Sequence, residues 1–191
     1  MDDNKPKEIV ASDTKPRRYS RKAFPPYRFV PGVNPHPTEH PQGHSYGKEE
    51  NLIEEFRPEK WDTDEHYLYG VDLYNYAYWW EAHEALEGLW GTVPKNDVRS
   101  HFLQGLIQIS AAFLKWHMGE YKGVKSLSES GRGYLKIVCE KYPVYAGLGV
   151  RDYLQKLDRH FAKVLANHSA GGSPLKDYPL IQLKEEERGS I

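Results

Sequence analysis

Proline restricts the possible folds of this 191-residue chain more than any other residue does. Nine of its 13 prolines lie in residues 1–60. Proline has no backbone N–H and a fixed φ angle, so neither a helix nor a central strand can run through prolines spaced this closely. We therefore expect regular secondary structure after residue 60 and an extended N-terminal segment before it.

The proline-rich segment divides into two parts by composition. Residues 5–28 hold eight Lys or Arg and two acidic residues, and we expect residues 1–22 to form a disordered basic tail. Residues 23–60 add aromatic residues and histidines to the prolines. This composition suits an extended Pro/His-rich arm that packs on the body, although proline content alone equally favours an unstructured segment.

Residues 61–168 carry the apolar periodicity of helices, as in Val150, Leu154, Leu157, Phe161 and Val164. Strand-like alternation is absent, so we expect no sheet. The predicted fold class is all-α, a compact bundle of about five helices. The expected helices span about 64–75, 78–90, 98–118, 120–141 and 150–167.

Two further features belong to this domain layout. Gly131 and Gly133 lie inside the fourth predicted helix, where glycine costs stability, so we expect them to permit a close helix crossing. Residues 169–191 are rich in Gly, Pro and charge. They predict a C-terminal tail with one docked apolar stretch, Leu175–Leu183.

The segment 78–90, Tyr-Trp-Trp-Glu-Ala-His-Glu-Ala-Leu-Glu-Gly-Leu-Trp, is the most informative part of the chain. A helix turns about 100° per residue, which puts Trp79 and Trp90 on one apolar face and His83 at its margin. Glu87 follows His83 one turn on. Because buried carboxylates need partners, we expect a polar site walled by Trp and Tyr.

Several chemistries are open to this site. His83 and Glu87 can ligate one metal ion, or His83 can act as a general base oriented by Glu84 or Glu87. His83, Glu84 and Glu87 are therefore the candidate catalytic residues, with Trp80, Glu81 and Trp90 supporting them. A hydrogen-bonded network that only joins helices is the alternative. A His-Glu-x-x-His zinc motif would need histidine at 87, and the di-iron motif Glu-x-x-His does not occur.

The third predicted helix adds a second polar stripe. Gln104 and Gln108 are one turn apart and can bond Glu84 or Glu87 across the helix pair. A solvated stripe is the alternative, since glutamine is mostly exposed.

These residues carry a resemblance. The pattern Trp79-x-Glu-Ala-His-Glu-x-Leu-Glu with Trp90, followed by Phe102-Leu-Gln-Gly-Leu-Ile-Gln, resembles the family called domain of unknown function 309 over about residues 65–125. The resemblance implies a small all-helical domain and no particular activity. It implies that the family signature includes Glu81, His83, Glu84, Glu87, Trp90, Gln104, Gly105 and Gln108.

The arm is similar to one found in some longer members of this family. His36 and His44 match that pattern, whereas His40 does not. Histidines beside prolines are stiffly presented, so we expect the arm to bring His36 and His44 over the second helix to meet His83 and Glu87. This set would suit Zn, Mn or Fe. A simple packing turn at Pro35-His36-Pro37 is the alternative.

Three function classes follow. The first is an uncharacterised soluble helical domain that acts as a binding or interaction module, with homo-oligomerisation favoured by its surplus Tyr and Trp. The alternative is a metal-dependent, hydrolase-like enzyme, which lacks an evident nucleophile because Cys139 lies on an apolar helix face. We expect no nucleic-acid partner, because only the tail is basic and residues 81–90 are acidic. The substrate, any small-molecule ligand and the metal stay open.

Composition sets the expected location. Net charge is −1, and Cys139 is the single cysteine, which suits a reducing compartment. No apolar run approaches the ~18–20 residues of a membrane span, and the N-terminus has no apolar signal region. We therefore expect a cytoplasmic protein with no membrane partner.

Overall fold

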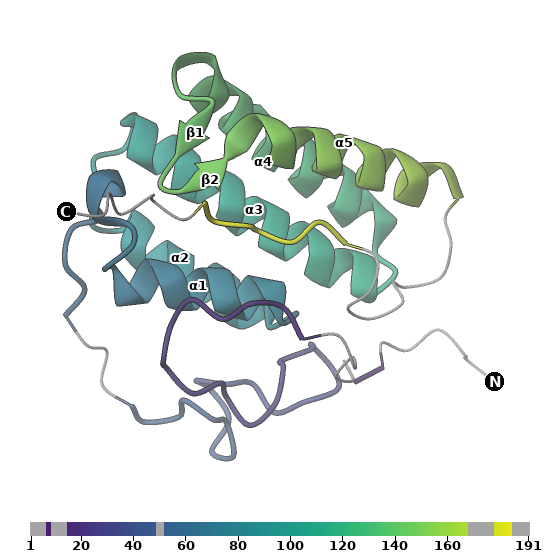
Figure 1. The fold of residues 1–191 in the computed structure, drawn as a ribbon. Helices are drawn as coiled ribbons and strands as arrows, with labels where there is room; N and C mark the ends of the chain where they lie inside the picture. The colour runs from purple at the N-terminus through teal and green to yellow at the C-terminus, as the bar shows by residue number, and fades with distance from the viewer. Residues whose placement is uncertain (1–6, 9–14, 49–51, 168–177, 185–191) are drawn as a thin grey trace.

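A computed structural model describes residues 7–8, 15–48, 52–167 and 178–184. Five α-helices make up most of these ranges (Figure 1), which confirms the predicted all-α class. The elements in chain order are a short 3-10 helix η1 (Pro58–Lys60), α1 (Glu65–Asn75), α2 (Trp79–Trp90), α3 (Val98–His117), α4 (Tyr121–Lys141), the strands β1 (Val144–Tyr145) and β2 (Leu148–Gly149), and α5 (Val150–Asn167).

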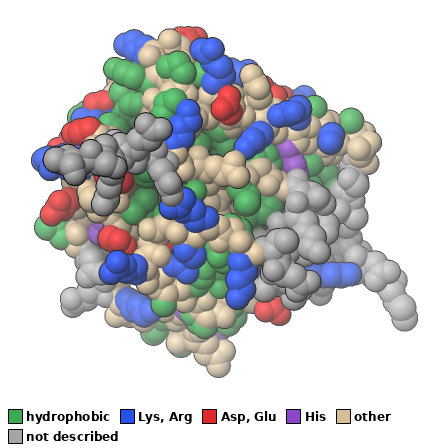
Figure 2. Space-filling view, in the orientation of Figure 1, with side chains coloured by type: hydrophobic (Ala, Val, Ile, Leu, Met, Phe, Trp, Pro, Cys, Tyr) green, Lys and Arg blue, Asp and Glu red, His purple; other side chains and the backbone are tan. Residues whose placement is uncertain are grey.

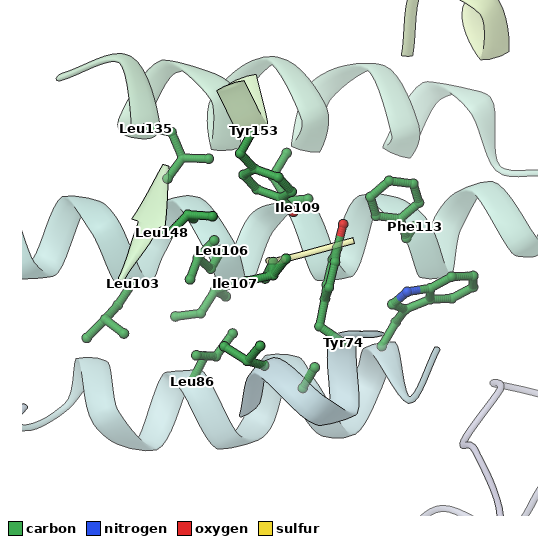
Figure 3. Packing of buried hydrophobic residues seen from close by; sticks show 14 of the residues in the cluster. Tyr74, Leu86, Leu103, Leu106, Ile107, Ile109, Phe113, Leu135, Leu148 and Tyr153 are labelled. Atoms are coloured by element: carbon green, nitrogen blue, oxygen red, sulfur yellow. The ribbon is translucent and has the colours of Figure 1, made fainter. Parts of the chain in front are cut away.

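Helix α3 is the centre of the bundle. Helix α2 packs on one side of it and α4 on the other, while α1 packs on α2 and α5 on α4. Figure 3 shows apolar side chains of α3 between Leu86 of α2, Tyr74 of α1, Leu135 of α4 and Tyr153 of α5. These residues are at most 2% exposed, so α3 is apolar on most sides because it has neighbours on most sides.

Two aspartates fix where helices begin. The Asp64 carboxylate accepts the backbone N–H groups of His66 and Tyr67 at the start of α1. Asp97 accepts the N–H of Arg99 at the start of α3. Such caps satisfy N–H groups that have no partner within the helix. Asp64 and Asp97 each directly precede the helix that they cap.

A two-stranded hairpin corrects the expectation of no sheet. Val144 pairs with Gly149 and Tyr145 with Leu148. The turn residues Ala146 and Gly147 have φ angles of 45° and 73°, as a tight hairpin turn requires. Strands of two residues are too short to show alternation, which is why the sequence pattern did not indicate them.

Residues 178–184 dock on the bundle, and they include the described part of the predicted apolar stretch Leu175–Leu183. They run between α1 and α5 (Figure 1). The Asn75 side chain accepts the Ile181 N–H and donates to the Ile181 carbonyl, both at 2.8 Å. Residues 168–177 and 185–191, which hold the rest of the predicted C-terminal tail, lie outside the described residues.

The N-terminal arm, residues 15–48, lies along α1 and α2 (Figure 1). The fully buried Asp72 of α1 accepts four hydrogen bonds from it, at 2.7–2.9 Å, from Arg18 Nε, the Tyr19 and Ser20 N–H groups and Ser20 Oγ. The docked segment therefore begins before the predicted boundary at residue 23. Residues 1–6 and 9–14 of the predicted tail lie outside the described residues.

Tyrosines of the body supply three further hydrogen bonds to the arm. Hydroxyls of the body donate to arm carbonyls, Tyr69 to Ala23, Tyr76 to Pro16 and Tyr78 to Pro25. A proline-rich segment has more backbone carbonyls than backbone N–H groups. Side-chain donors such as tyrosine hydroxyls therefore satisfy its carbonyls.

None of the described helices combines the length and the apolarity needed to cross a membrane.

Glycine permits the close crossing of α3 and α4. A Cβ at Gly131 would lie 3.0 Å from the Gly105 carbonyl oxygen and 3.0 Å from Ile109, whereas a Cβ at Gly133 would meet no atom within 4 Å. The predicted role in a close crossing therefore holds for Gly131 and is wrong for Gly133, which is exposed.

The two glycines give a matched test. We expect Gly131→Ala to lower the free energy of unfolding by about 1–3 kcal/mol, because the added methyl group overpacks the helix crossing. Gly133→Ala should raise it by about 0.5–1 kcal/mol through helix propensity alone. Urea denaturation measures both, and stabilisation by both variants would contradict the close crossing.

Candidate functional site on the second helix

Helix α2 presents different residues on its three flanks. Trp79, Ala82 and Leu86 lie in the core. The arm and the segment after it cover a second flank, where Glu81 is 5% exposed and a Cβ at Gly88 would collide with Ile53. The third flank is partly open to solvent, with residues at helical spacing: Trp80, His83, Glu84 and Glu87.

His83, Glu84 and Glu87 converge on the open flank. His83 Nδ1 lies 3.2 Å from Glu84 Oε1 and 3.8 Å from Glu87 Oε2. One ligand atom from each of the three side chains lies within 4.8 Å of the others. Among the described residues, this is the one group of three His, Cys, Asp or Glu side chains so arranged.

The group has the chemistry of a cation site. An imidazole nitrogen and two carboxylate oxygens are donors that zinc, manganese and iron accept. The side chains of His83, Glu84 and Glu87 are 31%, 46% and 52% exposed, so an ion can reach them directly from solvent.

Glu81 lies on the covered flank and is bound by the arm. Its Oε1 accepts the Phe29 backbone N–H at 2.9 Å and faces His44 Nε2 at 3.1 Å. Both Glu81 and the His44 side chain are 5% exposed. Burial, and next the Glu81 charge, raise the pKa of Tyr69 to about 12. Glu81 therefore lies beneath the arm and joins α2 to it.

The arm docks on α2, but the histidines do not gather as predicted. His44 meets Glu81, and His36 packs edge-on against Trp80 with ring centroids 5.4 Å apart. Neither belongs to the group around His83. Residues 81 and 83 leave a helix about 160° apart, so a histidine bound to Glu81 cannot also face His83.

The supporting residues are placed in three ways. Trp80 is half-buried against Phe29 and His36. Trp90 Nε1 donates to Ser100 Oγ at 2.8 Å and so ties α2 to α3. Gln104 and Gln108 are half-buried on α3, and within the described ranges neither bonds Glu84 or Glu87. Of the predicted aromatic wall, Trp80 therefore shares the open flank with His83, whereas Trp79 lies in the core and Trp90 contacts α3.

A surface hollow of about 340 Å³ lies elsewhere, where η1, the start of α3 and β1 meet. Its lining includes Arg57, Arg99, Tyr142 and Tyr145, and no predicted site residue. Arg99 pairs with Asp97 at 2.8 Å and with Glu55 at 2.6 Å, and its hydrogen bond lowers the pKa of Asp97. The positive charge of Arg99 in this hollow is thus already paired with two carboxylates.

Sequence reasoning missed Asp72 and its partners Arg18 and Ser20. The available signal was an aspartate within the apolar helix 65–75, since a carboxylate that is buried needs donors. The spacing of 52 residues between Ser20 and Asp72 hides that pairing from any local pattern.

Comparison with known families supports the resemblance. Residues 67–127 match the family model described as domain of unknown function (DUF309). The match spans α1 from its third residue, all of α2 and α3 and the start of α4, and it confirms the predicted resemblance to this family. No curated protein matches the chain.

The link between Glu81 and the arm can be tested by truncation. We expect Glu81→Ala to lower the free energy of unfolding by roughly 2–4 kcal/mol, because the buried donors of Phe29 and His44 lose their acceptor. It should also speed trypsin cleavage after Arg21 and Arg28, because a detached arm backbone fits the protease more readily than a docked one. The exposed Glu84→Ala is the matched control and should change stability by less than about 0.5 kcal/mol. Equal stability of the two variants would contradict the buried link.

Proposed function

We propose that this protein is a binding module whose ligand is a divalent transition-metal ion, held by His83, Glu84 and Glu87 on the open flank of α2. The observation that carries the proposal is the convergence of one nitrogen and two carboxylate oxygens within 4.8 Å. The proposed ligand set differs from the predicted one of His36, His44, His83 and Glu87: the two arm histidines have other contacts, and Glu84 takes part instead.

The spacing of the donor atoms suits a metal ion. In a tetrahedral zinc site with bonds of about 2.0–2.1 Å, ligand atoms lie about 3.3 Å apart. His83 Nδ1 is 3.2 Å from Glu84 Oε1 and 3.8 Å from Glu87 Oε2. Closing the set requires rotation of two half-exposed carboxylates and no movement of the α2 backbone.

The donor set also ranks the metals. Zinc, manganese and iron all accept imidazole and carboxylate donors, and the usual affinity order for such donors puts zinc above the other two. Three protein ligands leave a position for water. That open position is also what the alternative function, a hydrolase-like enzyme using the same three residues, requires. Self-association and a small-molecule ligand stay predictions.

Zinc titration of the full chain tests the proposal. We expect isothermal titration calorimetry to show one equivalent of zinc bound by the wild type, and His83→Ala to weaken this binding by at least about tenfold, as loss of a metal-supporting group does. His66→Ala is the matched control, since His66 is a partly exposed histidine on α1 outside the group.

Comparison of His83→Ala with the His66→Ala control shows which results would contradict the proposal. Zinc affinity that is unchanged in His83→Ala, or lowered equally in His66→Ala, would rule out a site centred on His83. A Glu84→Gln/Glu87→Gln variant adds a second measure, because it keeps side-chain size while removing both negative donors. We expect it to lose binding without loss of thermal stability.

A further inference from the structure

The arm concentrates positive charge in a chain of net charge −1. Residues 15–28 contain six Lys or Arg and no acid: Lys15, Arg17, Arg18, Arg21, Lys22 and Arg28. Lys and Arg side chains gather over the arm in the lower part of the molecule in Figure 2. The metal site proposed above uses none of these residues.

Arg18 and Arg28 hold the arm in place through hydrogen bonds to α1 and to the residue after it, and Lys22 lies 4.5 Å from the centroid of the Tyr69 ring on α1. Arg18 Nε donates to the buried Asp72 carboxylate at 2.9 Å, and its guanidinium lies 4.0 Å from the Phe24 ring centroid. Arg28 Nε donates to the Tyr76 carbonyl at 2.8 Å. These contacts fix the backbone near both ends of the basic segment.

The other four cations, Lys15, Arg17, Arg21 and Lys22, are exposed. They project from a backbone that is already ordered, because Asp72 also binds the N–H groups of Tyr19 and Ser20. A partner that neutralises these charges therefore pays little entropy for ordering the backbone.

The acidic run on α2 does not cancel this patch. The expectation of no nucleic-acid partner treated residues 81–90 as an acidic surface. Glu81 is 5% exposed and lies beneath the arm, as does the fully buried Asp72. Both carboxylates that hold the arm are thus hidden from an approaching polyanion, while the cations above them face solvent.

We propose that the docked arm binds the phosphate backbone of single-stranded nucleic acid through Lys15, Arg17, Arg21 and Lys22. Guanidinium groups suit phosphate oxygens because they offer paired donors. Tyr46, further along the arm, is 52% exposed and presents a ring on which a base can stack. A lipid surface is the less favoured partner, because Val33 is the one exposed large aliphatic residue in the described part of the arm.

Fluorescence anisotropy with a labelled oligouridylate of about 20 nucleotides tests the proposal on the full chain. Four phosphate contacts predict that log affinity falls with log salt concentration with a slope of about −3, at about −0.7 per contact. Arg21→Glu/Lys22→Glu removes two contacts. We expect this variant to lose at least about tenfold in affinity and to reduce the slope by about 1.4.

The control variant is Lys122→Glu/Lys125→Glu on α4, which changes two exposed lysines and alters net charge by the same amount. It should retain affinity within about twofold. Chymotrypsin resistance at Tyr19 and Tyr27, which precede Ser20 and Arg28, shows that the arm of the first variant stays docked. An equal loss in both variants, no oligonucleotide binding by the wild type, or binding only to phosphatidylserine vesicles would overturn the proposal.

Discussion

The hydrogen-bonding needs of a proline-rich arm organise the surface of this protein. Such a segment has carbonyl groups in excess of N–H groups, and buried groups of either kind need partners. Tyrosine hydroxyls of the body serve the carbonyls, as Tyr69, Tyr76 and Tyr78 do for Ala23, Pro16 and Pro25. Two buried carboxylates, Asp72 and Glu81, accept backbone N–H groups of the arm. Three of the 14 tyrosines in the chain thus serve to dock the arm. The arm in turn decides which residues of α2 stay open.

The helices were predictable because their information is local. Apolar residues at helical spacing, stop signals such as Gly91 and caps such as Asp97 all act within one or two turns, and the five helices of the structure follow them closely. The hairpin was not predictable, since two-residue strands carry no periodicity and depend on Ala146 and Gly147 adopting positive φ angles. Docking of the arm was predictable in outline from its aromatic residues. Its attachment points were not, because Ser20 and Asp72 are joined only by the tertiary fold.

The predicted site also divides into residues that local helix geometry brings together and residues whose positions depend on the tertiary fold. His83, Glu84 and Glu87 lie on one helix at spacings of one and four residues, so helix geometry alone brings them together. His36 and His44 come from another segment, and their positions depend on which flank of α2 the arm covers. Residues 81 and 83 point in nearly opposite directions from the helix. Once the arm binds Glu81, His44 is committed to the covered flank. The pattern likewise shows that aromatic rings lie near α2, but not which flank of the helix each ring packs on.

A net charge of −1 hides a strong separation of charge, and the arm produces it. By burying Asp72 and Glu81, the arm removes two carboxylates from the surface and leaves Glu84 and Glu87 beside His83 as the acidic remainder of α2. The same contacts hold Arg18 and Arg28 inward and leave Lys15, Arg17, Arg21 and Lys22 outward. One docking event therefore creates a small anionic face suited to a cation and a larger cationic face suited to a polyanion. Because the two faces use different residues, each can be altered by surface substitutions without disturbing the buried carboxylates on which both depend.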